Sequence, residues 1–311
     1  MKQFVKRTIQ KIFRAGLETS AFQAQLDLLA KQLARAPEHP VDQSTQLLLT
    51  LRYQELLRSK QTLPAFGDVG FRAYSQNDED GVLLFIFALI GTTNKKVVEV
   101  CAGTCVECNA ANLIINHYWR GILFDGNAAN IEFGRRYYAE HPNTLVRPPV
   151  FVHAWITPEN INELITSNGF AGEVDLLSLD MDGMDYWILK AIECIQPRVI
   201  VLEHNSPWGA ARAVTVPYQR DFVAQFVDGA PEYCGASLPA FVKLLRGRGY
   251  RLVGLETFGI NAFFLRNDVG PDILPERTVE SCFVFDPPTA AQQTTYEATL
   301  KRLEGRDYVE V

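Results

Sequence analysis

The sequence predicts an α/β fold in which a mostly parallel, seven-stranded, Rossmann-like sheet carries helices on both faces. From about residue 70, short β-branched or aliphatic runs alternate with segments of helical periodicity, the pattern of parallel strands joined by helical crossovers. Polar residues follow nearly every run, where the carboxyl ends of parallel strands bind ligands. The last two runs are nearly adjacent and therefore predict a terminal hairpin.

Residues 1–66 are expected to form a helical arm ahead of a domain that spans 67–311. Helical periodicity covers 17–36 and 42–60, with a Pro-rich break between them. The arm begins with a basic amphipathic stretch over residues 1–17, and residues 1–36 carry seven Lys and Arg against two acidic residues. Such a helix packs on its own domain, forms a homodimer with a second copy, or makes peripheral membrane contact. All three alternatives stay open at this stage.

The elements of the main domain follow from the hydrophobic pattern. The apolar run at 82–91 predicts a buried core helix, because it is too short to span a membrane. The expected strands are 96–100, 121–125, 149–155, 174–180, 198–204, 250–256 and 261–267. Helices are expected near 107–118, 128–140, 158–168, 184–195 and 237–248. Seven strands ending in a hairpin are typical of class I methyltransferases, whereas a dehydrogenase-type sheet would continue with another helical crossover.

Composition narrows the kinds of partner. The 311 residues are 47% hydrophobic and 21% charged, enough for a sizeable core, and the net charge of −6 argues against nucleic acid. A small-molecule or glycan acceptor fits better. Six cysteines, three of them within eight residues, do not resemble a disulfide framework, so a reducing cytoplasm is expected.

The three clustered cysteines allow two interpretations. Cys101, Cys105 and Cys108 form C-x3-C-x2-C, the spacing by which radical enzymes hold an iron–sulfur cluster. However, Glu107 comes directly before the last cysteine and the expected helix has already begun there, so one cluster would require that turn to unwind. We expect ordinary thiols and keep a radical enzyme as the third alternative.

The ends of the first three expected strands carry candidate cofactor-binding residues. They are Cys101, Ala102 and Gly103, then Asp125, Gly126 and Asn127, and then Trp155. An acidic residue after the second strand can accept both ribose hydroxyls, so Asp125 is a candidate for nucleoside binding. Trp155 could form the wall of an adenine site or be a structural tryptophan.

The ends of the fourth and fifth strands are rich in carboxylates. Asp180 and Asp182 follow one strand, Glu203, His204 and Asn205 end the next, and adjacent strands would bring them together. Asp180, Asp182, Glu203 and Asn205 suit Mg²⁺ or Ca²⁺. In the alternative, His204 acts as a general base, with Asp180 and Glu203 as further catalytic residues. Asp185 is expected to cap the following helix.

Four ordered blocks resemble the FkbM-type methyltransferases. They are YSQNDEDG at 74–81, VVEVCAGTCVECNAANLIINHYWRGILFDGN at 97–127, DLLSLDMDGMDYWILKAI at 175–192 and PRVIVLEHN at 197–205. The similarity spans about residues 70–270 and leaves out the arm. It implies an S-adenosylmethionine-dependent enzyme that O-methylates a sugar, a glycoconjugate or another hydroxylated natural product.

The resemblance also implies where the cofactor and acceptor lie. Ser75 and Gln76 would lie near S-adenosylmethionine, the segment from Glu99 to Gly103 would form its first loop, and Asp125 would bind the ribose. Asp180 and the segment 203–205 would face the methyl group and the acceptor. Aromatic and basic residues in the long connection 206–238 are expected to help hold the acceptor.

The chain departs from the family pattern in the first loop. That loop usually reads E-x-G-x-G-x-G, but here Cys101 and Cys105 stand at two of the glycine positions. Glycine allows a positive φ or a close approach to a ligand, so each cysteine could tighten or distort the cofactor site. A catalytically inactive, methyltransferase-like binding module is therefore the second alternative.

Overall fold

The computed structural model describes residues 41–311 except 225, 228–229, 232, 284–298, 300 and 302. The side chains of 226, 227, 230 and 231 are also outside the description. Residues 41–311 form one compact unit. The expectations for residues 1–40, including the basic amphipathic start and the helix at 17–36, lie outside the described residues.

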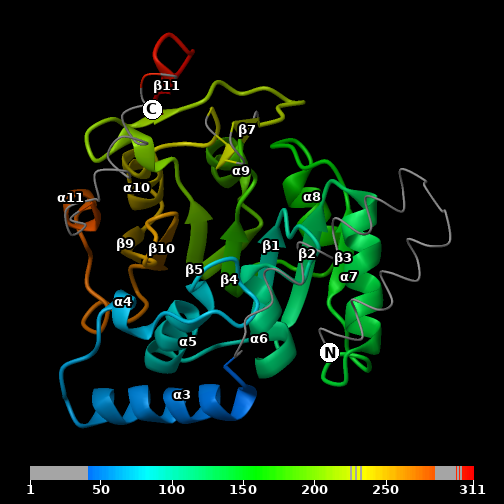
Figure 1. Cartoon of the computed structure of the whole chain (residues 1–311), viewed down its shortest axis with the longest axis vertical. Coiled ribbons are helices and arrows are strands. Elements are labelled where there is room, and N and C mark those ends of the chain that lie inside the picture. Colours follow the sequence, from blue (N-terminus) through cyan, green and yellow to red (C-terminus); the bar gives the residue numbers. More distant parts are fainter. Residues whose placement is uncertain are drawn as a thin grey trace, which may run out of the picture. The chain divides into compact units, whose positions relative to one another are not determined.

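The central sheet has seven strands in the order β3-β2-β1-β4-β5-β10-β9 (Figure 1). The strands are β1 (Lys96–Val100), β2 (Arg120–Asp125), β3 (Val150–His153), β4 (Gly172–Leu179), β5 (Ile195–Glu203), β9 (Tyr250–Leu255) and β10 (Asn261–Arg266). The first five run parallel, and β10 is antiparallel to both of its neighbours. This is the predicted α/β class, with the strand arrangement of class I methyltransferases.

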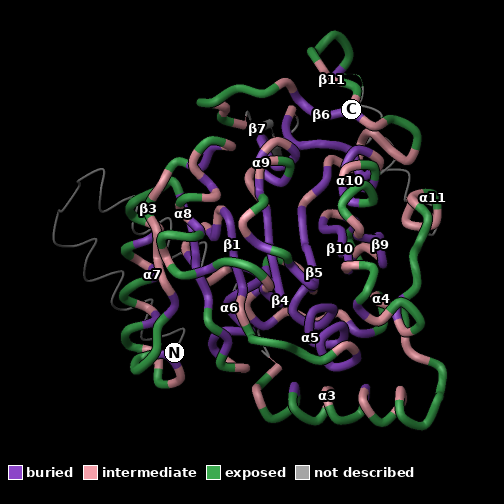
Figure 2. The backbone as a smooth tube through the Cα atoms, turned by 180° about the vertical axis from the view of Figure 1, so that it is seen from behind, coloured by how far each residue is buried: buried purple, intermediate pink, exposed green. Residues whose placement is uncertain are grey.

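Helices cover both faces of the sheet (Figure 1). One face packs against α3 (Gln43–Arg58), α4 (Phe66–Val69), α5 (Glu79–Ile90), α6 (Asn109–His117) and α7 (Ala128–Glu140). The other packs against α8 (Ile161–Ser167), α9 (Asp185–Ala191), α10 (Leu238–Arg246) and the short α11 (Val279–Cys282). The inner strands and helix α5 are buried along most of their length, whereas the edge strand β3 is only partly buried and α3 is largely exposed along its outer side (Figure 2).

Helix α5 is the expected buried core helix. Eleven of its twelve residues are buried, because it lies between the sheet and α3. Helix α3 was expected in the N-terminal arm, yet it packs on α5 and belongs to the same compact unit as the sheet. None of the described helices is long and apolar enough to cross a membrane.

A buried ion pair fixes the amino ends of β4 and β5. The Asp175 carboxylate lies 2.7 Å from Nη1 of Arg198 and also accepts hydrogen bonds from the amides of Thr93, Asn94 and Lys95. Arg198 donates in turn to the carbonyls of Ile90 and Gly91. These bonds connect the end of helix α5, the residues just before β1, and strands β4 and β5. They lie at the end of the sheet opposite the carboxyl ends of the parallel strands, where the polar residues are.

The connection after β5 contains a 3-10 turn, η1 (Ser206–Trp208), and short strands that the sequence did not predict. Strand β6 (Val214–Thr215) pairs with β11 (Val309–Glu310), and β7 (Phe226–Val227) pairs with β8 (Ala230–Pro231). The end of the described chain thus lies against the connection.

Candidate functional site

The loop after β1 has the backbone of a glycine-rich loop. Cys101, Gly103 and Cys105 have φ values of 61°, 54° and 64°. A left-handed conformation costs an ordinary L-residue about 1–2 kcal/mol, and glycine almost nothing. The two cysteines therefore occupy glycine positions without changing the path of the loop.

Helix α7 accommodates Cys105. A Cβ atom added at Gly134 would lie 2.7 Å from Cβ and 3.1 Å from Sγ of Cys105, closer than a normal contact. The hydroxyl of Tyr138, one turn further along α7, donates to the carbonyl of Cys105 at 2.8 Å. The loop has a cysteine at position 105 where the family pattern has glycine. The helix that packs on it has a glycine, Gly134, whose lack of a side chain leaves room for Cys105.

The three thiols do not converge on one site. Cys105 and Cys108 lie in the apolar cluster on one face of the sheet, whereas Cys101 packs against the cluster on the other face. Among the described residues, the group whose spacing suits a metal ion does not include these cysteines. Burial raises the pKa of Cys105 to about 12 and that of Cys108 well above its usual value, in line with the ordinary buried thiols that the sequence predicts.

Glu99, just before the loop after β1, is hydrogen-bonded to the neighbouring helix α6 and strand β4. Its carboxylate accepts hydrogen bonds from the amide of Ala110, at the start of α6, and from Oγ of Ser178 on β4, each at 2.8 Å. Burial, with a smaller contribution from Asp180, raises the pKa of Glu99 to about 8. Glu99 therefore positions the first loop from within the core.

Asp125 ends β2 as expected, with its side chain almost fully buried. Oδ1 accepts hydrogen bonds from the amide of Asn127 at 2.7 Å and from Nδ2 of Asn130 at 3.0 Å. Both bonds from the described residues use Oδ1, which leaves Oδ2 for a ligand hydroxyl. Asn127 also caps α7 by accepting from the amide of Ala129.

A cavity of about 120 Å³ lies at the carboxyl ends of β1 to β4. Its walls are Cys101, Gly126, Ala154, Trp155, Ile156, Met181, Met184, Arg220 and Phe222. Cavities that hold drug-sized ligands measure about 300–1,000 Å³. This cavity has the position expected for a cofactor and is smaller than a whole nucleoside cofactor requires.

The connection after β5 closes this cavity. The indole Nε1 of Trp155 donates to the carbonyl of Arg220 at 2.9 Å, although half of the Trp155 side chain is exposed. Phe222 lies over Gly183, where an added Cβ would be 2.5 Å from its ring. A Cβ at Gly126 would meet the Trp155 ring at 3.2 Å. Trp155, Phe222 and the segment around Arg220 thus bound the cavity.

Ser75 and Gln76 are not among the residues that line this cavity. Ser75 is buried in a turn, where its amide donates to Asp80 and its Oγ accepts from the Asp80 amide. Gln76 is exposed. Their contact with a cofactor stays a prediction.

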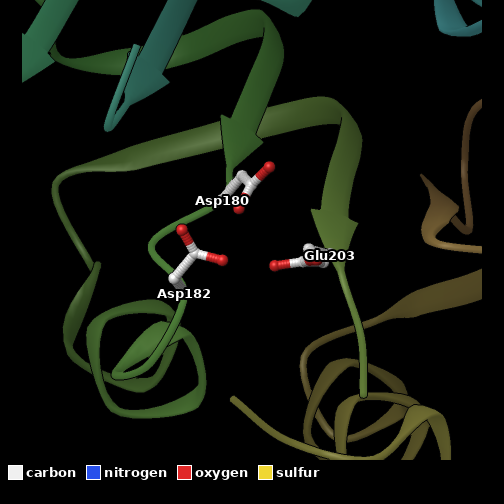
Figure 3. Close-up of side chains that lie close together, drawn as sticks. All are labelled: Asp180, Asp182 and Glu203. Carbon is white, nitrogen blue, oxygen red and sulfur yellow. The ribbon is translucent and has the colours of Figure 1, made fainter. Parts of the chain in front are cut away.

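Three carboxylates meet at the ends of β4 and β5 (Figure 3). Asp180, Asp182 and Glu203 each place an oxygen within 4.8 Å of the other two. Among the described residues, this is the group whose spacing suits a metal ion. Asp182 reaches it through a left-handed backbone conformation, with φ of 52°. Aspartate tolerates that conformation better than most residues.

Burial and mutual repulsion keep protons on this carboxylate group. Burial, followed by Asp185 and Asp182, raises the pKa of Asp180 to about 7. Burial and then Asp180 raise the pKa of Glu203 well above its usual value. The hydrogen bond between the two side chains lowers the pKa of Asp180 and raises that of Glu203, so it favours the proton on Glu203.

The neighbouring predicted residues have different surroundings. Asp185 accepts hydrogen bonds from the amides of Met181 and Gly183, so it shapes the turn before α9. The prediction that it caps the helix is wrong, because Met184 holds the N-cap position and Asp185 is the first residue of α9. His204 packs edge-on against Phe283 on the other face of the sheet, and burial lowers its pKa to about 4. Asn205 donates through Nδ2 to the carbonyl of Cys234 at 3.0 Å.

Two further polar residues lie beside the carboxylates and were not predicted. Asn261 is directly opposite Glu203 in the β5–β10 register. Its Nδ2 donates to Oε1 of Glu79 at 2.7 Å, and Glu79 also accepts from the amide of Asn77. Glu79 lies in the SQNDEDG block, which was a usable signal, whereas only the pairing of β10 with β5 reveals Asn261.

Comparisons with known proteins support the fold alone. No protein-family model and no curated protein matches the sequence. A methyltransferase from Clostridium acetobutylicum ATCC 824 is 11% identical, with coverage of 70% of this chain and 96% of that one, at a TM-score of 0.38. The CcbJ methyltransferase from Streptomyces caelestis is 12% identical, and the alignment covers 60% of this chain and 94% of that one at a TM-score of 0.38.

A third similar structure is the magnesium protoporphyrin IX methyltransferase from Synechocystis PCC 6803, solved with bound S-adenosylmethionine. It is 10% identical, and the alignment covers 60% of this chain and 76% of that one at a TM-score of 0.37. These solved structures are S-adenosylmethionine-dependent or other methyltransferases. At such low similarity, the function has to be argued from the site itself.

Proposed function

We propose that this protein is an S-adenosylmethionine-dependent O-methyltransferase of the FkbM type. The observation that carries the proposal is the first loop, whose left-handed backbone at Cys101, Gly103 and Cys105 survives the loss of two glycines. That loop opens beside the cavity at the strand ends and next to Asp125. A loop that had lost its ligand would have no reason to keep a conformation that is costly for cysteine.

The residues around the cavity fit the cofactor by chemistry. Oδ2 of Asp125 would accept hydrogen bonds from the ribose hydroxyls, and Trp155 would lie against the adenine, with Gly126 leaving room for the ring. The segment around Arg220 and Phe222 would move outward on binding, as covering loops of enzymes commonly do. The cofactor supplies an activated methyl group when it is bound.

The carboxylate pair supports methyl transfer to oxygen. The methyl carbon gains a bond to the acceptor oxygen while its bond to sulfur breaks, and the hydroxyl proton must leave. Asp180, with a pKa of about 7, is a proton acceptor suited to neutral pH, and its hydrogen bond to Glu203 orients it. His204 is the alternative base, although its ring packs on the other face of the sheet.

A divalent cation is the second proposal for the same carboxylates. Asp180, Asp182 and Glu203, with Asn205 nearby, offer the hard oxygen ligands that Mg²⁺ and Ca²⁺ prefer. Such an ion would lower the cost of deprotonating the acceptor hydroxyl. Loss of activity with EDTA and its recovery with Mg²⁺ would favour the cation over a carboxylate base.

We further propose that the acceptor is a sugar, a glycoconjugate or another hydroxylated natural product, and that the enzyme is cytoplasmic. Residues 1–17 would make peripheral membrane contact or join two copies of the chain. Exposed leucines on α3, at Leu47, Leu48 and Leu51, favour the homodimer.

An inactive binding module is the competing function, and the small cavity favours it. Mass spectrometry of the supernatant from denatured protein separates the two proposals, because an active enzyme is expected to retain S-adenosylhomocysteine or S-adenosylmethionine.

In calorimetry, Asp125→Ala should bind S-adenosylmethionine at least tenfold more weakly than wild type, because one hydrogen-bonded carboxylate contributes about 1.5–3 kcal/mol. Asp272→Ala, an exposed change that lies outside the walls of this cavity, is the control. Equal affinities of Asp125→Ala and wild type would reject this placement of the cofactor.

A further inference from the structure

Residues 217–223 of the connection after β5, called the lid below, form part of the wall of the candidate cofactor cavity. Two lid residues, Arg220 and Phe222, line that cavity. Five of the seven lid residues are exposed to solvent. Segments with few buried contacts open at a low cost in free energy, so the lid is the wall that can move.

The remaining walls are held by the central sheet and by the turn before α9. The Ala154 amide donates to the carbonyl of Asp125 at 3.1 Å, which continues the pairing of β3 with β2. The Met181 amide donates to Oδ1 of Asp185 at 2.8 Å. With the lid in this position the cavity measures about 120 Å³, whereas sites for drug-sized ligands measure about 300–1,000 Å³. A whole nucleoside cofactor therefore has to displace the lid to enter.

The lid begins next to a firmly held residue, Val216. The Val216 side chain is fully buried, and its amide donates to the carbonyl of Gly235 at 3.1 Å. Its carbonyl accepts a hydrogen bond from Nε1 of Trp187 at 2.9 Å. Val216 is therefore the fixed point from which the lid residues would swing.

Two side chains attach the lid to the segment after β3. Nε1 of Trp155 donates to the carbonyl of Arg220 at 2.9 Å. The Tyr218 hydroxyl donates to the Glu159 carboxylate, whose two oxygens lie 3.0 and 3.1 Å away. Trp155 itself lines the cavity, whereas Tyr218 and Glu159 are not among the residues of its wall. The bond between Tyr218 and Glu159 can therefore be removed without changing a residue that would touch the cofactor.

Glu159 is an ionised acceptor at neutral pH. A hydrogen bond from Thr157 is the largest cause that holds the pKa of Glu159 below its usual value, and Tyr218 and Arg220 lower it further. A hydrogen bond to a charged acceptor is stronger than one between neutral groups, although exposure to water weakens it. The Tyr218 ring also packs on Trp187, with ring centroids 6.1 Å apart, so the loss of the hydroxyl alone leaves this packing in place.

We propose that the hydrogen bond between Tyr218 and Glu159 is a latch that holds the lid over the cavity, and that cofactor binding has to break it. The latch lowers the affinity for the cofactor, which makes it a regulatory element of the cofactor site. This assignment rests on the proposed function, because it takes S-adenosylmethionine as the ligand of the cavity.

The test begins with Tyr218→Phe, measured without added cofactor. In hydrogen exchange, the peptide that contains the lid should exchange about two- to tenfold faster than in wild type, as expected for the loss of one hydrogen bond. In calorimetry, the variant should bind S-adenosylhomocysteine more tightly by a similar factor, because the apparent affinity rises with the fraction of open protein. Tyr118→Phe is the matched control, since it makes the same change at an exposed tyrosine outside the cavity wall. It should equal wild type in both measurements.

Glu159→Ala breaks the same bond from the other side, and it serves if Tyr218→Phe fails to fold, which thermal melting would reveal. The double variant should exchange no faster than either single variant, because all three lack one and the same bond. Glu159→Gln keeps an acceptor oxygen and should stay close to wild type. Additive effects of the two single changes would show that the residues act independently, and would overturn the latch.

Unchanged exchange of the lid in Tyr218→Phe would also overturn the latch, as would an equal acceleration in Tyr118→Phe. Faster exchange with unchanged affinity for S-adenosylhomocysteine would overturn the statement that the latch opposes binding. If none of these proteins binds S-adenosylhomocysteine while the exchange responds as expected, the proposed function is rejected and the latch stands.

Discussion

The match between Cys105 and Gly134 predicts a strong energetic coupling between two residues that are far apart in sequence. In Gly134→Ala, the new methyl group would lie 2.7 Å from Cβ of Cys105 and 3.0 Å from the ring of Phe151. Carbon atoms normally approach to about 3.5–4.0 Å. Overpacking of this kind costs about 1–3 kcal/mol, and the better helix propensity of alanine offsets about 1 kcal/mol of it.

Cys105→Gly removes the other side of the contact. It loses a buried side chain worth about 1–2 kcal/mol and regains about 1 kcal/mol from the left-handed backbone. In the double variant, the alanine methyl enters the space that the cysteine vacates. We therefore expect the double variant to be about 1–3 kcal/mol more stable than the sum of the two single changes implies.

The measurement is the free energy of unfolding in urea for the four proteins of the cycle. Cys101→Gly combined with Gly134→Ala is the matched control, because Cys101 also has a positive φ but packs against the other face of the sheet. That pair should be additive within about 0.5 kcal/mol. A coupling near zero for Cys105 and Gly134, or an equal coupling for the control pair, would refute the compensation.

Two predictions concern buried carboxylates. Burial alone would raise the pKa of Asp175, but Arg198 and the amides of Thr93, Asn94 and Lys95 outweigh it and hold the pKa below its usual value. Asp175 therefore stabilises the fold above about pH 3.8, and this contribution is lost as the pH falls through its lower folded value. Asp175→Asn should lower the free energy of unfolding by about 3–5 kcal/mol at pH 7. The difference in melting temperature between this variant and wild type should become smaller below pH 3.8, and a difference that does not change with pH would contradict the ion pair. For Glu99, burial raises the pKa from 4.5 to about 8, so its stabilising contribution is present below pH 4.5 and is lost as the pH rises through 8. Glu99→Gln should gain about 3 kcal/mol of stability relative to wild type between pH 6 and pH 9, and parallel melting curves across that range would show that Glu99 is already ionised.

Local sequence patterns predicted most of the elements. Strand β1 (Lys96–Val100) and helix α7 (Ala128–Glu140) have the expected bounds, and β10 (Asn261–Arg266) ends one residue early. Their apolar periodicity and capping residues act over a few neighbours, so they are readable without tertiary information.

Helix α9 shows where local patterns fail. It was expected over 184–195 but ends at Ala191. Oδ1 of Asn162 accepts the amides of Glu193 and Cys194, and its Nδ2 donates to the carbonyl of Ala191. A side chain from α8 thus supplies the hydrogen bonds that end the helix, and no pattern within 184–195 contains that contact.

The candidate site was likewise predicted from the sequence only in part. The residues at strand ends, including Asp125, Asp180 and Glu203, could be chosen from sequence because parallel strands place their carboxyl ends at one edge of a sheet. Which of those residues meet was a tertiary result. Asp180, Asp182 and Glu203 come together, while His204 turns to the opposite face because side chains alternate along β5.

The sequence by itself determined the α/β class, the hairpin of the last two strands and the position of a loop with cysteines at glycine positions. Only the tertiary structure decided that this loop keeps its left-handed backbone, because the room for Cys105 comes from Gly134 on another helix. It also separated Cys101 from the other two thiols and paired Asn261 on β10 with Glu203 on β5. Packing joins residues that are distant along the chain, and spacing in sequence carries no record of those contacts.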